Sequence, residues 1–119
     1  MTTVDTLLPS DAPSDMAARA AEAAAFLKTL AHEGRLMILC HLATGERSVG
    51  ELEDLLNMRQ AAVSQLLARL REDGVVSARR SGRTVFYQLA NETTTQVIGM
   101  LHKIYCGADD AHAADQPPT

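Results

Sequence analysis

Two neighbouring stretches of this 119-residue chain carry polar side chains at a spacing that suits duplex DNA. The first is a predicted helix from about Arg59 to Asp73, with short polar and basic side chains outside its apolar face. The second is a basic hairpin from Arg79 to about Tyr87. A helix fits the major groove, and a basic hairpin beside it can reach the backbone or the minor groove. Together the two stretches predict a winged helix-turn-helix that binds double-stranded DNA.

The predicted DNA contacts divide by side-chain chemistry. Gln60, Ser64 and Gln65 are candidates for reading base edges, because a glutamine amide can form two hydrogen bonds to adenine and a serine hydroxyl is adaptable. Arginine guanidinium groups are better suited to phosphates and to the minor groove. The candidates for those contacts, in the helix and in the hairpin, are Arg59, Arg69, Arg79, Arg80 and Arg83.

Positive charge is concentrated in the same region. The chain has a formal net charge of −4, yet residues 59–83 hold six arginines against two acidic residues, Glu72 and Asp73. A basic patch on an acidic body is the electrostatic pattern expected of a protein that binds a specific DNA site. The distribution of charge therefore favours DNA binding, although the net charge alone does not.

Cys40 and Cys106 are the only cysteines and the remaining candidates for chemistry. Composition alone favours two buried small hydrophobic side chains, since cysteine is often buried. With His41 and His102 they can also form an unusual zinc site, because zinc accepts two Cys and two His ligands. The chain has no Cys-x-x-Cys and no GxGxxG-like loop, which argues against a thiol-redox enzyme. We therefore expect no enzymatic activity, no catalytic residues and no cofactor.

Helix caps and apolar spacing predict the elements that position these residues. Ser14 or Asp15 can cap a first helix that continues to about Ala31. A second helix is predicted over residues 33–43, and a turn over residues 44–47. The apolar spacing of the second helix predicts one buried face made of Leu36, Leu39, Cys40 and Ala43.

Further signals place the DNA-facing elements. Ser48 and Glu51 form a capping-box sequence that begins a short helix through Leu56, and Asn57 ends it. The DNA-facing helix follows, and Gly74 stands where a left-handed C-terminal cap belongs. Its predicted buried face consists of Val63, Leu66, Leu67 and Leu70.

Two strands and a last helix complete the domain. The strands are predicted over residues 75–79 and 84–89, with Ser81-Gly82 in the turn between them. Asn91 can cap a last helix that continues through Cys106. Its predicted apolar stripe is Val97, Ile98, Leu101, Ile104 and Tyr105. The element order is α-α-α-α-β-β-α, which places the chain in the mainly α (α+β) class.

One domain is predicted over residues 14–106, between a disordered tail at residues 1–13 and a disordered acidic tail at residues 107–119. No stretch approaches the roughly 20 apolar residues of a membrane span, and Asp5 stands where a signal peptide needs positive charge. We expect a cytoplasmic protein without a membrane partner. Aromatic residues make up only 3% of this small chain, which favours stabilisation by dimerisation.

Over roughly residues 20–106 the chain resembles the ArsR/SmtB family of winged-helix repressors. The resemblance implies a homodimer packed through its first and last helices, and repression by operator binding that an inducer relieves. Two positions depart from the family pattern: Glu33 stands where a proline is frequent, and Leu66 where many members have Gln or His beside the groove. The matching motifs are Leu30-Ala31-His32 with Arg35 and Ile38-Leu39, Val63-Ser64-Gln65 with Leu67 and Leu70, and residues 74–89.

The family resemblance also bears on the inducer. In metal sensors of this family, the metal-binding sequence of the third helix resembles Glu-Leu-Cys-x-Cys-Asp. Residues 51–55 here read Glu-Leu-Glu-Asp-Leu, so the two metal-binding thiols are missing. Zinc sensors of the family carry a pattern resembling Asp-x-His and His-x-x-Glu in the last helix. This chain does not supply it, because it has Asn91 and Thr93 at the first pair of positions and His102 followed by Tyr105 at the second. A zinc-responsive repressor with Cys and His ligands remains the alternative interpretation.

Ile38-Leu39-Cys40 and Ile104-Tyr105-Cys106 resemble the paired cysteine positions of the SqrR/BigR/YgaV subgroup, whose members respond to persulfides and polysulfides. The resemblance implies that Cys40 and Cys106 form a redox switch. A disulfide or a longer sulfur bridge between them would weaken operator binding and derepress sulfide-response genes. Persulfides and polysulfides are thus the expected inducers, and operator DNA and a second copy of the chain the expected partners.

Overall fold

The computed structural model describes residues 13–107, and the side chains of residues 15–105. The chain divides into two units, residues 1–32 and 33–119. In the first unit, α2 spans Pro13–Leu30, with Asp15 in its first turn and Lys28 in its last, where each charge complements the helix dipole. Ser14 and Asp15, the predicted caps, therefore lie inside the helix. The predicted tails lie outside the described residues, except for Pro13 and Gly107.

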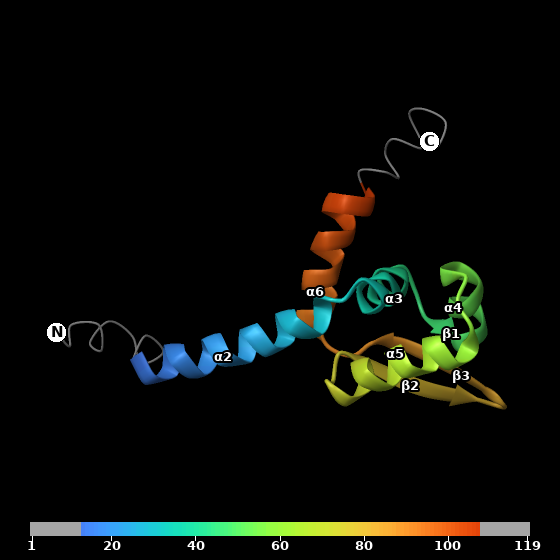
Figure 1. Cartoon of the computed structure of the whole chain (residues 1–119), viewed down its shortest axis with the longest axis horizontal. Coiled ribbons are helices and arrows are strands. Elements are labelled where there is room, and N and C mark those ends of the chain that lie inside the picture. Colours follow the sequence, from blue (N-terminus) through green and yellow to red (C-terminus); the bar gives the residue numbers. More distant parts are fainter. Residues whose placement is uncertain (1–12, 108–119) are drawn as a thin grey trace. The chain divides into compact units, whose positions relative to one another are not determined.

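The second unit contains the winged helix, and Figure 1 shows its elements in order. Helix α3 (Glu33–Ala43) packs against four other elements of this unit: α4 (Val49–Leu56), α5 (Gln60–Glu72), β3 (Thr84–Leu89) and α6 (Glu92–Leu101). Its buried residues are Gly34, Ile38, Leu39 and Leu42. The predicted buried face was wrong except at Leu39, because neighbours contact α3 on several sides. The other three predicted members, Leu36, Cys40 and Ala43, are half-buried.

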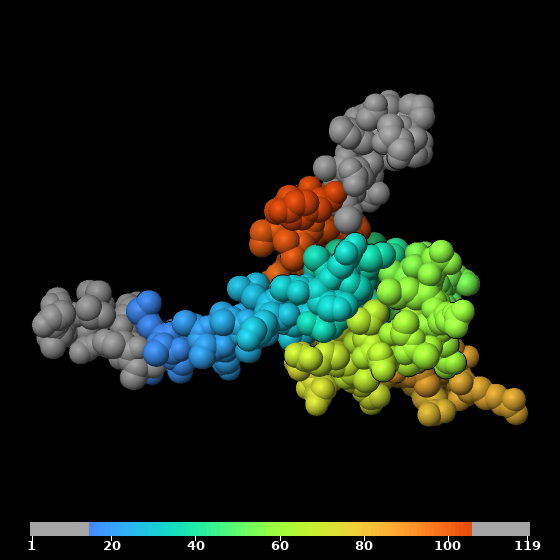
Figure 2. All heavy atoms as spheres, in the orientation of Figure 1, coloured from blue at the N-terminus to red at the C-terminus, as the bar shows by residue number. Residues whose placement is uncertain are grey.

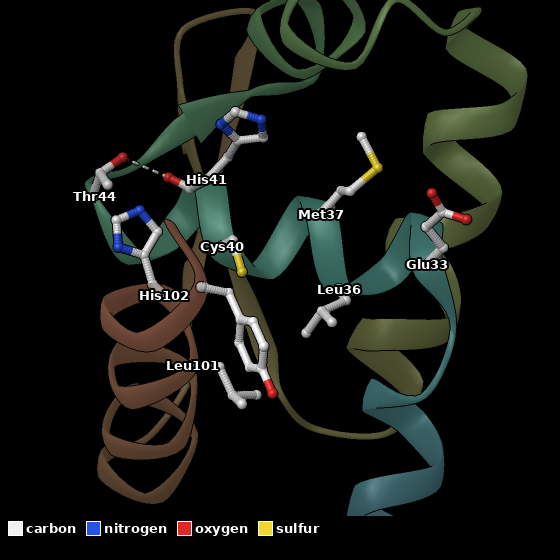
Figure 3. A pocket seen from close by; sticks show the side chains of 9 residues that line it. Glu33, Leu36, Met37, Cys40, His41, Thr44, Leu101 and His102 are labelled. Atoms are coloured by element: carbon white, nitrogen blue, oxygen red, sulfur yellow. Dashed lines mark hydrogen bonds between the residues drawn. The ribbon is translucent and has the colours of Figure 1, made fainter. Parts of the chain in front are cut away.

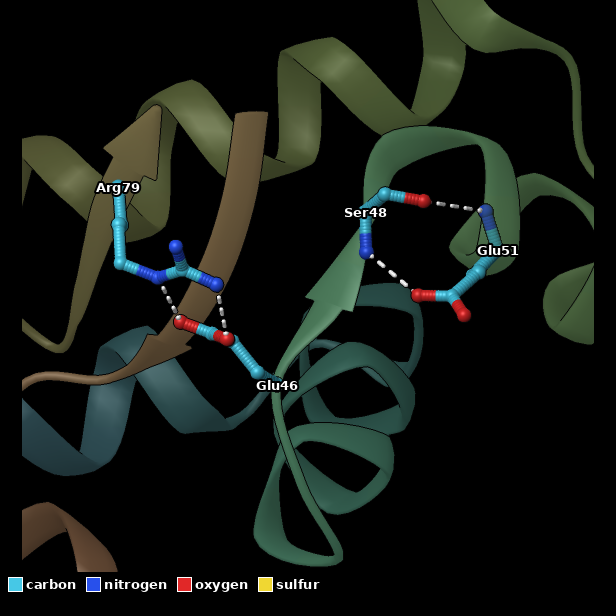
Figure 4. A network of polar contacts seen from close by, with 4 residues as sticks. All are labelled: Glu46, Ser48, Glu51 and Arg79. Atoms are coloured by element: carbon cyan, nitrogen blue, oxygen red, sulfur yellow. Dashed lines mark hydrogen bonds and ion pairs between the residues drawn. The ribbon is translucent and has the colours of Figure 1, made fainter. Parts of the chain in front are cut away.

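A short strand that the sequence did not predict follows α3. Strand β1 (Arg47–Ser48) overlaps the predicted turn and pairs antiparallel with β3, with Arg47 opposite Tyr87 and Ser48 opposite Phe86. Helix α4 (Val49–Leu56) then begins with the predicted capping box (Figure 4). Ser48 Oγ accepts a hydrogen bond from the Glu51 backbone N at 3.1 Å, and Glu51 Oε1 accepts one from the Ser48 backbone N at 2.8 Å. Asn57 ends the helix in the left-handed region, at φ 55°.

Helix α5 (Gln60–Glu72) is the predicted DNA-facing helix, and it lies along the hairpin of β2 (Val76–Ser81) and β3 (Thr84–Leu89) (Figure 1). The sheet is antiparallel with the order β1-β3-β2. Gly74 has φ 75° after α5, which confirms the predicted left-handed cap. Ser81 pairs with Thr84, and Gly82, at φ 65°, takes the first position of the two-residue loop. This is the position at which a tight hairpin favours glycine.

Helix α6 (Glu92–Leu101) begins as predicted at Asn91, whose Oδ1 accepts a hydrogen bond from the Thr94 backbone N at 2.8 Å. The prediction of one α-helix through Cys106 was wrong, because a π-helical turn, η2 (His102–Gly107), replaces its last part. Ile98 is buried, whereas Ile104 and Tyr105 are 55% and 69% exposed. The end of the predicted apolar stripe therefore lies outside the core of this unit.

The core of the second unit is almost entirely aliphatic. On α5 the prediction was correct for Val63, Leu67 and Leu70, while Leu66 is half-buried. Within the described residues, no helix is long and apolar enough to cross a membrane. The buried hydrophobic residues of this unit are Ile38, Leu39, Leu42, Leu52, Leu56, Val63, Leu67, Leu70, Val75, Val76 and Ile98.

Candidate DNA interface and cysteine cavity

The solvent-facing side of α5 carries the predicted base-reading residues. Gln60, Ser64 and Gln65 are all exposed, and Gln60 and Ser64 lie one turn apart on the same face. The opposite face is fixed in the core, so these side chains are held on a rigid support. Arg59, which caps the helix through its extended backbone and makes no side-chain capping hydrogen bond, is also exposed. The structure thus brings four of the predicted contact residues together at one end of α5.

Two of the other predicted phosphate-binding arginines form ion pairs. Arg69 Nε lies 2.9 Å from Asp73 Oδ2, one turn further along α5. Arg79 binds Glu46 with two hydrogen bonds, at 2.8 Å and 2.7 Å (Figure 4), and its guanidinium carbon lies 5.0 Å from the centroid of the Phe86 ring. The hydrogen bond from Arg79 lowers the pKa of the Glu46 carboxyl, and Glu46 in turn raises the pKa of Arg79. These contacts orient Arg79 toward the loop before β1.

Arg80 and Arg83 lie at the exposed end of the hairpin, the wing of the fold. Figure 2 shows the tip of this hairpin projecting beyond the helices of its own unit. Between α5 and β3 there is also a surface hollow of about 460 Å³, which Ser64, Arg71 and Tyr87 help to line. Sequence reasoning did not select Arg71 or Tyr87. For Tyr87, the alternation of side chains along β3 was a signal in the sequence, because it places Tyr87 on the same face of the strand as Val85 and Leu89.

A second cavity, also of about 460 Å³ but more enclosed and more apolar, surrounds Cys40 (Figure 3). Helix α3 forms one wall, and the end of α6 with the start of η2 forms the other. Figure 3 shows the side chains of Cys40 and Leu101 directed into the space between these walls. The lining residues are Glu33, Leu36, Met37, Cys40, His41, Thr44, Leu101, His102 and Tyr105.

The environment of His41, next to Cys40, lowers the pKa of its imidazole. Burial is the largest cause, and electrostatic interactions with Arg47 and His102 lower this pKa further. Its backbone carbonyl accepts hydrogen bonds from Thr44 Oγ1 at 2.8 Å and from Arg47 Nε at 3.5 Å. Arg47 Nη2 also donates to Thr44 Oγ1 at 2.8 Å. These bonds connect the end of α3, and with it the cavity, to β1 and the sheet.

Cys106 lies in η2 directly after Tyr105, which lines the cavity, but its side chain is outside the described range. The pairing of Cys40 with Cys106 therefore stays a prediction. The zinc alternative needed Cys40, His41 and His102 together with Cys106. In the part of the chain that the structure describes, no three His, Cys, Asp or Glu residues are arranged to hold a metal ion.

Comparison with known proteins agrees with this geometry. Residues 32–78 match the family model for bacterial regulatory proteins of the arsR family. Over 95 residues the chain is 48% identical to the biofilm growth-associated repressor of Agrobacterium fabrum, covering 80% of this chain and 81% of that protein. The chain belongs to the arsR family. It is therefore a DNA-binding transcriptional regulator rather than an enzyme, as the sequence predicted.

Other similar proteins support the fold. The chain is 45% identical over 95 residues to the transcriptional activator HlyU of Vibrio cholerae, covering 80% of this chain and 88% of HlyU. A solved structure of reduced HlyU matches with a TM-score of 0.75, covering 77% of this chain and 97% of that chain. A homodimeric winged helix-turn-helix DNA-binding domain from Mycobacterium bovis matches at 31% identity and a TM-score of 0.67, covering 83% of this chain and 89% of that one. The predicted winged helix-turn-helix is thereby confirmed.

Proposed function

We propose that the protein is a homodimeric repressor that releases operator DNA when persulfides or polysulfides join Cys40 to Cys106. The observation that carries this proposal is the cavity around Cys40, whose opposite wall includes Tyr105, the residue before Cys106. A bridge between the two cysteines would fix α3 to the last helix. Repression is supported by the relative from Agrobacterium fabrum, and a role for the redox state by the HlyU structure named for its reduced form.

The proposed chemistry needs no oxidant other than the persulfide. The thiolate of Cys40 attacks the outer sulfur of R–S–SH, so that a new S–S bond forms and R–S⁻ leaves. The thiolate of Cys106 then attacks the Cys40 sulfur of Cys40–S–SH, and HS⁻ leaves with the electron pair. Two thiols are oxidised to a disulfide while the persulfide is reduced to a thiol and hydrogen sulfide. Addition of further sulfur before closure would lengthen the bridge.

The length of the bridge can give selectivity for sulfur species. A disulfide needs Cα atoms within roughly 7 Å of one another, whereas a tetrasulfide spans a longer distance. A cysteine pair slightly too far apart for a disulfide would respond to persulfides and resist peroxide. If hydrogen peroxide inactivates the repressor as readily as a persulfide does, this selectivity argument fails.

Dimerisation is supported by apolar side chains that the second unit leaves exposed. Met100, Ile104 and Tyr105, along α6 and η2, are all more than half exposed. In α2, Met16 and Leu27 are exposed as well. Exposed apolar surface of this kind marks an interaction site, and the domain from Mycobacterium bovis is homodimeric. We propose that the first and last helices form the dimer interface.

In the proposed complex with operator DNA, Gln60, Ser64 and Gln65 read base edges in the major groove, while the arginines hold the backbone. Arg80 and Arg83 are the stronger candidates in the wing, because Arg79 is already bound to Glu46. We place this activity in the cytoplasm, where a bacterial regulator meets its DNA. A sulfur bridge would shift the α5 helix of one protomer relative to that of its partner and so lower the affinity for the operator. A coupling free energy of about 1–3 kcal/mol between bridge formation and operator binding corresponds to a loss of roughly 5- to 150-fold in affinity.

The test measures operator affinity of the metal-free, reduced protein before and after complete reaction with glutathione persulfide. The operator is first selected from random duplexes with the reduced protein. We expect the wild type to lose affinity and to regain it with a reductant, and Cys106→Ser to keep its affinity throughout. If the affinity of the wild type does not change, the redox switch is refuted, and Cys40 and Cys106 have no part in regulation.

A further inference from the structure

We propose that the cavity around Cys40 selects uncharged, apolar sulfur donors, such as dialkyl trisulfides, over anionic donors such as glutathione persulfide or inorganic polysulfide. This inference rests on the proposed sulfur-sensing function and names the substrate class of the same site. It concerns the encounter before the first S–S bond forms, and it follows from the size, the walls and the charge of the cavity.

The size and the walls of the cavity suit a small apolar molecule. Its volume of about 460 Å³ lies within the usual range for small-molecule sites, about 300–1,000 Å³. Leu36, Leu101 and Met37 provide aliphatic and thioether surface, and Tyr105 an aromatic ring. Sulfur atoms make favourable contacts with aromatic rings, so a chain of sulfur atoms fits this lining.

The charge of the lining disfavours anions. Among the described residues that line the cavity, none is a lysine or an arginine, and Glu33 contributes a carboxylate. Arg47, which lies close enough to affect His41, donates its hydrogen bonds to the His41 carbonyl and to Thr44 Oγ1. A carboxylate or polysulfide anion that enters the cavity would lose hydration without gaining an opposite charge, which is costly.

With a trisulfide, the first step is a balanced exchange. The thiolate of Cys40 attacks an outer sulfur of R–S–S–S–R and forms Cys40–S–S–R, while R–S–S⁻ leaves with the electron pair of the broken S–S bond. The mixed disulfide can then react with the thiolate of Cys106, which expels R–S⁻. Each step exchanges one S–S bond for another, so the trisulfide itself is the oxidant.

Two trisulfides of similar size but different charge provide the test: uncharged dipropyl trisulfide and anionic bis(2-carboxyethyl) trisulfide. The full-length Cys106→Ser protein has Cys40 as its one cysteine. Rates of adduct formation at Cys40, followed by mass spectrometry, are divided by the rates with 2-mercaptoethanol, a thiol without a charged substituent, which corrects for intrinsic differences in reactivity. We expect the normalised rate for the neutral reagent to be higher by about tenfold, equivalent to about 1.4 kcal/mol.

A charge placed in the lining should change this ratio. Met37 lines the cavity and is 39% exposed, whereas Leu55 on α4 is 44% exposed and lies outside it. Met37→Lys should raise the normalised rate for the anionic reagent and narrow the ratio severalfold, and Met37→Glu should widen it. Leu55→Lys, which adds the same charge at a similarly exposed helical site, should leave the ratio unchanged.

Equal normalised rates for the two reagents overturn the inference, as does a ratio that Met37→Lys and Leu55→Lys change equally. A cavity closed by the second copy of a dimer would also give equal rates, and would overturn the inference in the same way. The proposed function is judged separately, by whether glutathione persulfide releases the wild type from its operator. That result does not depend on the ratio, so the two failures can be told apart.

Discussion

Thr94 allows a sharp test of the packing around α6. It is fully buried, and its Oγ1 makes no hydrogen bond within the described part of the chain. Its backbone N donates to Asn91 Oδ1, so the helix cap does not need the hydroxyl. A buried polar group without a partner costs about 1–3 kcal/mol. Replacing the hydroxyl by a methyl group of similar size should therefore increase stability.

Thr94→Val makes this replacement. Valine and threonine have similar helix propensities, so the free energy of unfolding should rise by about 1–3 kcal/mol from the hydroxyl alone. For a domain of this size, each kcal/mol corresponds to roughly 4–8 °C in Tm. Urea unfolding followed by circular dichroism measures the change. The protomer concentration must be kept constant, because dimerisation shifts apparent stability.

Thr93→Val is the matched control, since Thr93 is exposed and lies next to Thr94 in α6. An exposed substitution of this kind should change stability by no more than about 0.5 kcal/mol. If Thr94→Val leaves stability unchanged or lowers it, the reasoning is wrong. The hydroxyl must then be satisfied, for instance by a buried water molecule.

Four further substitutions test the DNA interface and the cavity. Arg83→Ala should weaken binding to all duplexes and reduce the slope of log affinity against log salt concentration by about one unit. Arg79→Ala should have a smaller effect, because Arg79 is already bound to Glu46. If Arg83→Ala weakens binding only to the operator, its role in phosphate binding is contradicted. Gln65→Ala should reduce discrimination between operator and random duplex by about 1–3 kcal/mol, and an equal loss on both would reassign Gln65 to positioning. Folding lowers the pKa of His41, so its contribution to stability is present above pH 6.5 and is lost as the pH falls below that value. His41→Gln should therefore make the free energy of unfolding depend less on pH across pH 5–7. If urea unfolding shows the same pH dependence for His41→Gln and the wild type, the lowered pKa of His41 is contradicted.

The features that the sequence predicted correctly depend on local chemistry. Ser48 and Glu51 are three residues apart and satisfy each other's backbone groups, so the start of α4 could be predicted from these residues alone. Gly74 and Asn57 adopt the left-handed conformation that their residue types favour. The exposed side of α5 followed from the spacing of Val63, Leu67 and Leu70.

The features that the sequence did not predict depend on contacts between distant residues. Strand β1 exists because Arg47 and Ser48 meet β3 about 40 residues later, and a two-residue strand leaves no periodic pattern. Ile38 and Leu42 are buried because four other elements surround α3, so the spacing of apolar residues did not identify one core face. The cavity combines α3 with residues 101–105, and its lining could not be derived from either segment alone.

The positions of the two tyrosines have a practical consequence. The chain has no tryptophan, so Tyr87 and Tyr105 dominate its intrinsic fluorescence and near-ultraviolet absorption. Tyr105 lines the cavity around Cys40, while Tyr87 lies on β3 beside the DNA-facing helix. Each of the two regions thus has its own optical reporter. Stopped-flow fluorescence of Tyr87→Phe and Tyr105→Phe can then time the response of the cavity and that of the wing separately, without an added label.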